Sequence, residues 1–203
     1  MPSIRFRLLA VVTLVVPIMV VATTATSDED KVASEVLLVL NTMRTNPSSF
    51  IPAIDRYVTH VRSFTKDPKA LTAAAKEIKA ILKTQKALEP FNILGMLQLA
   101  AQDQAADIAK TGVMGHIGSD GSNPMTRVQK YGKTNTLAEC ITYGHMTAEL
   151  IVASFLVDEG TPDRGHRKNL LNSEYTKVGI AVGSHPTYAR ACVIVLSSTQ
   201  PSK

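Results

Sequence analysis

Two histidines that each follow a glycine are the side chains of this sequence best suited to chemistry. They are His116 and His166, which lie far apart along the chain. Between them, Glu139 lies inside the otherwise apolar run 137–141, where a carboxylate is costly unless a partner compensates its charge. Neutral imidazole is the commonest metal ligand and titrates near physiological pH, so an imidazole or an imidazole-bound cation would serve as that partner. The sequence therefore predicts a site of two imidazoles and a carboxylate, which only a folded domain can bring together.

Other catalytic arrangements are poorly supported. The sequence has no H-E-x-x-H, no G-x-S-x-G and no glycine-rich phosphate loop. A nucleophile pair of Cys140 with His166 is conceivable, but a disulfide from Cys140 to Cys192 would disable it. A metal-assisted hydrolase, with His116 and His166 as ligands and Glu139 as the base, is the better enzymatic alternative.

The first 25 residues have the layout of a secretory signal peptide. Arg5 and Arg7 precede an uncharged stretch from Leu8 to Val21, and small residues up to Ala25 suit cleavage. The uncharged stretch is short for a membrane-spanning helix, and no later stretch approaches the required length. We therefore expect a secreted, extracellular protein without a stable membrane anchor, in which residues 26–203 form a single domain.

The positive charge of the chain belongs partly to this leader. The 203 residues carry a formal charge of +5, and residues 1–25 contain two of the 22 basic residues and none of the 17 acidic ones. The remaining 20 basic and 17 acidic residues leave +3, which is typical of a solvated surface and argues against nucleic acid as a partner. The lysines after Asp67-Pro68 are likewise predicted to be a solvated face and not a lipid headgroup patch, because Glu77 interrupts them and no aromatic anchor accompanies them.

The sequence contains two cysteines, Cys140 and Cys192. In an oxidising compartment an even pair of cysteines most simply forms a disulfide. The alternative is two buried apolar thiols, because Cys192 is followed by the apolar run 193–195.

The remaining polar residues of interest are predicted to have structural or surface roles. His185 sits in a turn, and His60 and His145 lie beside polar residues, so all three are predicted to be exposed. Arg164 and Arg167 could bind an anionic ligand, but the favoured prediction is that they cap the preceding helix or pair with Asp158, Glu159 or Asp163.

The elements that must position these residues change type along the chain. Apolar residues at helical spacing predict a long helix starting at Ser27, a second starting at Asp67, and a third from Leu94 that Gly112 ends. Shorter helices are predicted over 51–61, 124–131 and 147–158, and strands over 136–143, 177–182 and 191–196. Helices come first, and strands then surround one helix without βαβ repetition. The pattern predicts an α+β fold with a small antiparallel sheet.

At these segments the chain resembles the CAP superfamily, the cysteine-rich secretory, antigen and pathogenesis-related proteins, in its SCP-like form. The resemblance runs from about Ser34 to Leu196, and its most specific pieces are GHIGSDGSNPMTRVQKYG, AECITYG and RGHRKNLLNSEYTKVGIAVG. The long excursion between His116 and Glu139 and the GHRKNLL ending look like the bacterial-type branch. The resemblance implies a three-layer α-β-α sandwich with the small sheet flanked by helices, secretion, and a central cleft with two histidines and two acids.

The resemblance also implies which residues line that cleft. His116 and His166 match the family's two histidines, and Glu139 matches one of its acids. Asp158 stands where a helix-borne glutamate of the family would lie; its rivals are Glu159 and Asp163.

Such a set suffices for a divalent metal such as zinc with an open coordination position. Alternatively, Glu139 is structural and fixes the tautomer of a histidine. One departure from the family is that Cys140 stands where asparagine is usual.

The function that the resemblance implies is a non-enzymatic binding module. Its expected partners are a divalent metal in the cleft, a sterol or fatty acid, and an extracellular protein in host or cell-surface interaction. The alternative is a metal-dependent secreted hydrolase or protease that uses the same cleft, with Glu139 as the candidate catalytic residue.

Overall fold

The computed structural model describes residues 27–198, and the predicted signal peptide lies outside the described residues. The helices, in chain order, are α1 (Asp28–Thr45), the 3-10 helix η1 (Pro47–Phe50), α2 (Ile51–Val61), α3 (Pro68–Thr84), α4 (Gly95–Thr111), α5 (Pro124–Gln129), α6 (Ala148–Val157) and α7 (Gly165–Leu170). The strands are β1 (Asn92–Ile93), β2 (Ala138–Tyr143), β3 (Tyr175–His185) and β4 (Ala189–Ser198).

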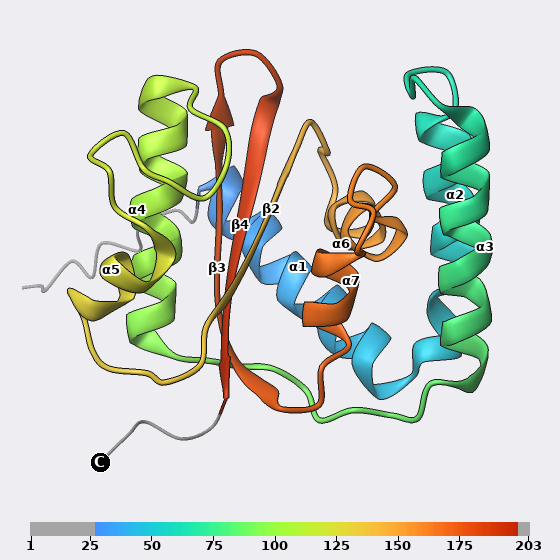
Figure 1. Ribbon diagram of the computed structural model, residues 1–203, viewed down its shortest axis with the longest axis horizontal. Helices are drawn as coiled ribbons and strands as arrows, with labels where there is room; N and C mark the ends of the chain where they lie inside the picture. Colours follow the sequence, from blue (N-terminus) through green and yellow to red (C-terminus); the bar gives the residue numbers. More distant parts are fainter. Residues whose placement is uncertain (1–26, 199–203) are drawn as a thin grey trace, which may run out of the picture.

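The sheet is the middle layer of the molecule (Figure 1). Helices α4 and α5 lie on one side of it, α1, α6 and α7 lie on the other, and α2 and α3 stand beyond α6. The predicted α+β sandwich of three layers is therefore confirmed, with a further helix pair outside it. None of the helices among residues 27–198 combines the length and the apolar composition that a bilayer-spanning helix requires.

The strand order of the sheet is β1-β3-β4-β2. Strands β2 and β3 both pair antiparallel with β4, as predicted, whereas β1 pairs parallel with β3 through Asn92–Lys177 and Ile93–Val178. The sheet is therefore mixed and not purely antiparallel. A strand of two residues is too short to show alternation in the sequence, which is why β1 was not predicted.

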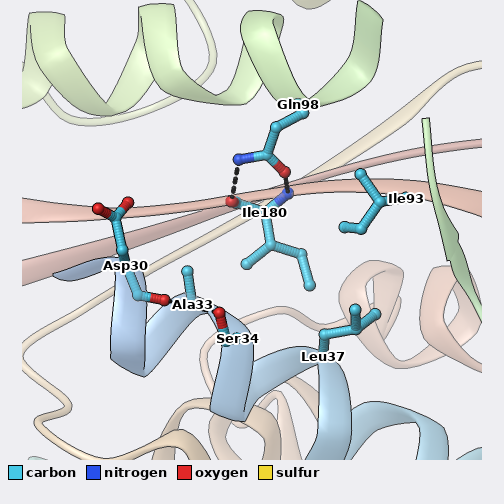
Figure 2. A pocket seen from close by; sticks show the side chains of 7 residues that line it. All are labelled: Asp30, Ala33, Ser34, Leu37, Ile93, Gln98 and Ile180. Atoms are coloured by element: carbon cyan, nitrogen blue, oxygen red, sulfur yellow. Dashed lines mark hydrogen bonds between the residues drawn. The ribbon is translucent and has the colours of Figure 1, made fainter. Parts of the chain in front are cut away.

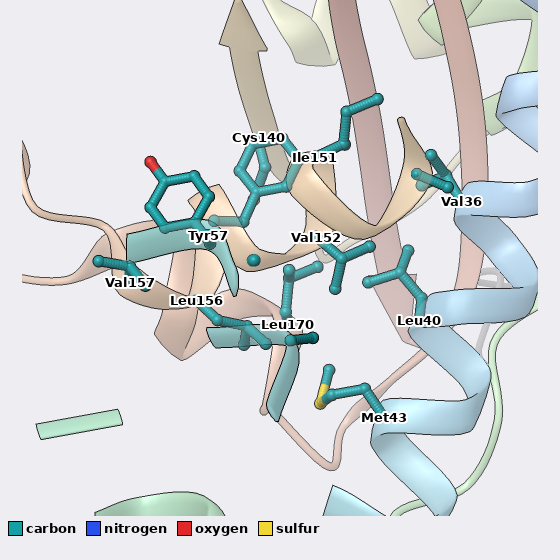
Figure 3. Close-up of a cluster of buried hydrophobic side chains, with 14 of the residues drawn as sticks. Val36, Leu40, Met43, Tyr57, Cys140, Ile151, Val152, Leu156, Val157 and Leu170 are labelled. Carbon is teal, nitrogen blue, oxygen red and sulfur yellow. The ribbon is translucent and has the colours of Figure 1, made fainter. Parts of the chain in front are cut away.

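The long helices begin and end where their capping residues predict. The side chain of Ser27 accepts a hydrogen bond from the backbone of Asp30 at the start of α1, and Asp67 accepts two backbone N–H groups at the start of α3. Helix α4 ends at Gly112, whose φ of 70° lies in the left-handed region that favours glycine. The helical stripes are buried as predicted, and Figure 3 shows residues of α1 and α6 packed in the larger core cluster.

Strand β2 lies at the sheet edge opposite β1 and sends side chains into both helical layers. Cys140 packs in the larger core cluster with α1 and α6, whereas Ile141 packs in the smaller cluster with α4. Because successive side chains of a strand point to opposite faces, Glu139 shares the face of Ile141. This alternation places Glu139 on the side of the sheet where α4 and α5 lie.

The two cysteines are buried free thiols, so the predicted disulfide is wrong and the alternative of two apolar thiols holds. The strand register gives the reason, because Cys140 lies opposite Ile194 and Cys192 lies opposite Thr142. The cysteines are thus diagonal neighbours and not a facing pair. Burial raises the pKa of Cys140 to about 12 and that of Cys192 further, which keeps both thiols protonated and unreactive.

Candidate functional site

The first histidine–carboxylate pair joins the loop after α4 to the edge strand β2. The Nδ1 atom of His116 lies 2.9 Å from Oε1 of Glu139. The Glu139 side chain is only 2% exposed, whereas that of His116 is 49% exposed. A cavity of about 220 Å³ opens beside the pair and is lined by His116, Pro124, Leu137, Ala138 and Glu139.

A buried arginine supplies the positive charge that Glu139 needs. Arg127 of α5 is 2% exposed, and its Nη2 donates to both carboxylate oxygens of Glu139, at 3.1 and 2.8 Å. The same Nη2 donates to the backbone carbonyl of His116 at 3.1 Å, and Nη1 donates to the carbonyl of Ser122 at 2.9 Å. Arg127 therefore fixes the carboxylate and the loop together. Sequence reasoning missed this residue, because nothing in its neighbourhood signals that it is buried.

The loop that carries His116 is anchored on both sides of the histidine. The backbone N–H of Gly115 donates to the hydroxyl of Tyr143 at 2.9 Å, and its carbonyl accepts from the side chain of Gln104 at 3.0 Å. Farther along, the backbone N–H of Ser119 donates to Asp107 at 2.7 Å. These contacts restrict the backbone that positions the imidazole.

The second pair lies at the junction of α6 and α7. Nδ1 of His166 lies 2.9 Å from Oδ1 of Asp158, while Oδ2 accepts the backbone N–H groups of His166 and Arg167 at 3.0 and 3.3 Å. The Asp158 side chain is 3% exposed and that of His166 is 24% exposed. The His166 ring also packs edge-on against Phe155 with 5.4 Å between ring centroids.

The hydrogen bonds to Asp158 keep its carboxylate ionised. Burial alone would raise the pKa of Asp158, but hydrogen bonds from His166, Thr161 and the backbone of Arg167 outweigh burial and hold the pKa below its ordinary value. The neighbouring Glu159 behaves differently, because burial raises its pKa. The hydrogen bonds, and not the pKa values, identify Asp158 as the one of the three candidate acids, Asp158, Glu159 and Asp163, that contacts His166.

The arginines around His166 hold the end of α6, as predicted. Arg164 donates to the carbonyl of Asp158 at 2.7 Å, and Arg167 donates to the carbonyls of Leu156 and Val157 at 2.6 and 2.8 Å. Their carboxylate partner is Glu77 of α3, and not one of the acids predicted from sequence proximity.

Each pair leaves one ring nitrogen available. Because a carboxylate accepts the hydrogen bond, Nδ1 carries a proton in both His116 and His166, and in the neutral form of each ring Nε2 keeps a free lone pair. The carboxylate oxygens are already engaged: Arg127 and His116 occupy those of Glu139, and hydrogen-bond donors of the α6–α7 loop and α7 occupy those of Asp158.

The predicted metal ligands do not fit a four-residue centre. Within the described part of the chain, no group of three or more His, Cys, Asp or Glu side chains is placed to hold one metal ion. The acids instead orient the imidazoles, which is the structural role considered for Glu139. The two Nε2 atoms are the only ligands of the predicted set, His116, Glu139, Asp158 and His166, that remain free for a metal.

The two histidine–carboxylate pairs lie on either side of strand β2, next to Cys140. Asn169 of α7 donates to the Cys140 thiol at 3.8 Å. Burial is the main cause of the raised pKa of that thiol, and the charges of Asp158 and Glu139 add to it. Glu139 precedes Cys140 on β2 and lies on the α4 and α5 side of the sheet, whereas Asp158 ends α6 on the other side. Within residues 27–198, no hydrogen bond or ion pair links one histidine pair to the other.

The remaining histidines lie outside this site. His60 is exposed, as predicted, but the prediction for His185 is wrong, because it is buried and its Nδ1 accepts the backbone N–H groups of Thr187 and Tyr188. His145 is half-buried against Tyr57, and burial, followed by the charge of His60, lowers its pKa to about 4. Each of the two mispredicted histidines fills a local packing role.

Comparisons with known proteins point to one family. The family model described as CAP, cysteine-rich secretory protein family, matches residues 38–196. The uncharacterised protein YkwD of Bacillus subtilis is 25% identical over 120 residues, which are 57% of this chain and 45% of YkwD. The chain thus spans less than half the length of this relative.

Solved structures of bacterial proteins are similar in part. An outer surface protein of Borrelia burgdorferi is 20% identical with a TM-score of 0.48, and the match covers 64% of this chain and 90% of that protein. An extracellular protein containing an SCP domain from Bacillus anthracis is 20% identical with a TM-score of 0.46, over 55% of this chain and 35% of that protein.

Proposed function

Because the chain belongs to the CAP, or cysteine-rich secretory protein, family, we propose that it is an extracellular binding module that recognises its ligand through Nε2 of His116 and of His166. Family membership by itself supports a broader statement, that the chain is an extracellular-type CAP protein. One observation carries the finer proposal: in both residues a buried carboxylate holds Nδ1 at 2.9 Å. Each ring is thus oriented with a defined tautomer and a free nitrogen.

The free nitrogens define the chemistry of the ligand. An unprotonated Nε2 accepts a hydrogen bond from a hydroxyl or amide group, and after protonation it donates one to an anion. A divalent ion such as zinc, when bound, would take the same nitrogen as a ligand. With two nitrogen ligands and no free carboxylate, we expect only modest affinity for such an ion.

A zinc titration of the purified protein tests the role of the two nitrogens. We expect weak binding that His166→Ala and His116→Ala each reduce, while His60→Ala, which removes an exposed histidine elsewhere, leaves it unchanged. Asp158→Asn should weaken binding by about tenfold or more, as expected for a residue that orients a ligand. Binding that neither His116→Ala nor His166→Ala alters would contradict the proposal.

A turnover assay on the same purified protein distinguishes binding from catalysis. Arg127 occupies both oxygens of Glu139, which leaves that carboxylate poorly placed to act as a general base. We therefore expect no turnover of peptide or ester substrates after zinc is added. Turnover that disappears in His166→Ala would overturn the non-enzymatic proposal in favour of a metal-dependent hydrolase.

A second proposal concerns the predicted lipid partner, for which a separate groove has more room. A cavity of about 290 Å³ lies between α1 and the β1–β3 edge, and Figure 2 shows apolar side chains lining it. There the amide of Gln98 pairs with both the carbonyl and the N–H of Ile180, at 2.7 and 3.0 Å, so the strand edge presents no unpaired group at this point. The lining residues are Asp30, Ala33, Ser34, Leu37, Ile93, Gln98 and Ile180.

This groove suits a fatty acyl chain better than a sterol. Its volume of about 290 Å³ is near the lower limit of roughly 300 Å³ for ligand pockets, which favours a slender ligand. Displacement of a fluorescent fatty acid tests the proposal, and we expect Leu37→Glu to abolish uptake. Leu99→Glu, on an exposed face of α4, is the matched control and should not affect uptake. Equal uptake of the fatty acid by the unsubstituted protein, Leu37→Glu and Leu99→Glu would contradict the proposal.

A further inference from the structure

The outer side of α3 carries an evenly spaced row of lysines. Lys69, Lys76 and Lys83 are exposed and recur every seven residues, about two helical turns, so they lie along one side of the helix. The small exposed residues Ala73 and Ala80 alternate with them. Figure 1 shows α3 at the outside of the molecule, at the opposite end from α4 and α5. The row is therefore accessible along its length.

The acid within this row does not neutralise it. Glu77 follows Lys76 in sequence, but its carboxylate pairs with Arg164 at 3.0 Å and Arg167 at 3.1 Å. Those hydrogen bonds lower the pKa of Glu77 and commit its charge to the α7 side of the helix. Within residues 27–198, Lys69, Lys76 and Lys83 form no ion pair, unlike Lys79, which pairs with Asp55. The Glu77 side chain is 48% exposed, but its charge is paired with these two arginines instead of with the lysine row.

An exposed aromatic residue lies near one end of the row. Phe64, in the loop between α2 and α3, is 77% exposed, more than any other large apolar side chain in the described part of the chain. Arg62 and Lys66 flank it, and neither forms an ion pair with a described residue. The one acid between Arg62 and Lys69 is Asp67, whose side chain caps α3. The loop thus combines an apolar tip with net positive charge.

We propose that this basic surface, made of Arg62, Phe64, Lys66, Lys69, Lys76 and Lys83, docks the protein on the anionic surface of a lipid bilayer. The lysine row complements the negative headgroups, and each basic residue near such a surface strengthens binding by about fivefold. Phe64 enters the boundary between headgroups and acyl chains. A basic row alone would suit any polyanion; the exposed aromatic residue beside it is what selects a bilayer. This inference does not depend on the histidine pairs.

A tryptophan placed at the tip gives a direct test, because the chain contains no tryptophan. In Phe64→Trp, vesicles of phosphatidylglycerol should shift the emission to shorter wavelength, and brominated acyl chains should quench it. Phosphatidylcholine vesicles should have neither effect. High salt should reverse the shift, because the Debye length falls to about 3 Å near 1 M. Residues 1–26 are identical in all the variants, so they cannot cause a difference between them. The indole at position 64 reports only on its own surroundings.

Two matched variants make the test specific. Lys69→Glu, Lys76→Glu and Lys83→Glu combined with Phe64→Trp should lower the apparent affinity by at least a hundredfold, with an unchanged circular dichroism spectrum. Leu38→Trp, at a residue 67% exposed on α1, should show no shift. The proposal is overturned if the indole introduced by Phe64→Trp stays solvated with anionic vesicles, if both lipids act equally, or if only a soluble polyanion such as heparin binds.

Discussion

The two histidine–carboxylate pairs share one geometry but differ in what compensates the buried acid. In both, 2.9 Å separates Nδ1 from a carboxylate oxygen. Glu139 of strand β2 receives a full positive charge from Arg127 of helix α5, whereas Asp158 receives backbone N–H groups from the start of α7. The same imidazole orientation is thus reached once by a long-range ion pair and once by local hydrogen bonds. The pairs should therefore respond differently to substitution and to pH.

Loss of the buried guanidinium should cause the largest change. Arg127→Met leaves Glu139 as a buried carboxylate without its charge partner, which should lower the free energy of unfolding by about 3–5 kcal/mol. Urea denaturation measures this difference. Arg56→Met is the control, because the Arg56–Glu149 pair is exposed and its loss should change stability little. Equal effects of the two substitutions on the free energy of unfolding would show that Arg127 does not stabilise the buried Glu139 carboxylate.

Neutralising the second acid should have a smaller and pH-dependent effect. Asp158→Asn keeps the side-chain shape and tolerates the left-handed backbone at φ 52°, but it loses charged hydrogen bonds, so stability should fall by about 2 kcal/mol at neutral pH. The pKa of Asp158 is lower in the folded protein, so its stabilisation is present above the ordinary aspartate pKa of about 3.9 and is lost as the pH falls through the folded value.

The pH dependence is itself the check on this second pair. Denaturation curves of both proteins between neutral pH and pH 2 should converge as the solution becomes more acidic. A stability difference that stays constant over this range would mean that the charge of Asp158 is not what the hydrogen bonds stabilise.

Removing the imidazoles should have the smallest effects on stability, and the two effects should differ. His166→Ala loses the edge-on contact with Phe155 and leaves Asp158 with only backbone and hydroxyl donors, so a loss of about 1–2 kcal/mol is expected. His116 is half-exposed and Glu139 keeps Arg127, so His116→Ala should cost less than about 1 kcal/mol. Thermal melts compare the two, and a larger loss for His116→Ala would reverse the comparison.

The elements that the sequence predicted are those with a strong local signal. Periodic apolar residues, a capping Ser27 or Asp67 and a closing Gly112 determine the long helices without reference to the rest of the chain. Period-two alternation over residues 177–182 did the same for β3. In contrast, β1 has only two residues, and its pairing depends on β3 some eighty positions later.

The candidate site was predictable only in its residue types. His116, Glu139 and His166 stood out, whereas Arg127 did not, because its role depends on burial and on a strand that lies later in the chain. Strand register, which no local pattern reveals, decided against the disulfide of Cys140. The sequence thus identified candidate groups, and the fold determined which of them contact each other.

The protonation of the two rings tests the central claim most directly. Long-range proton–nitrogen NMR correlations of the histidine rings, recorded at a pH where they are neutral, distinguish the two tautomers. We predict that His116 and His166 both carry the proton on Nδ1, while the exposed His60 shows the mixture of tautomers expected in solution. A proton on Nε2 in either His116 or His166 would contradict the claim that buried carboxylates orient both imidazoles.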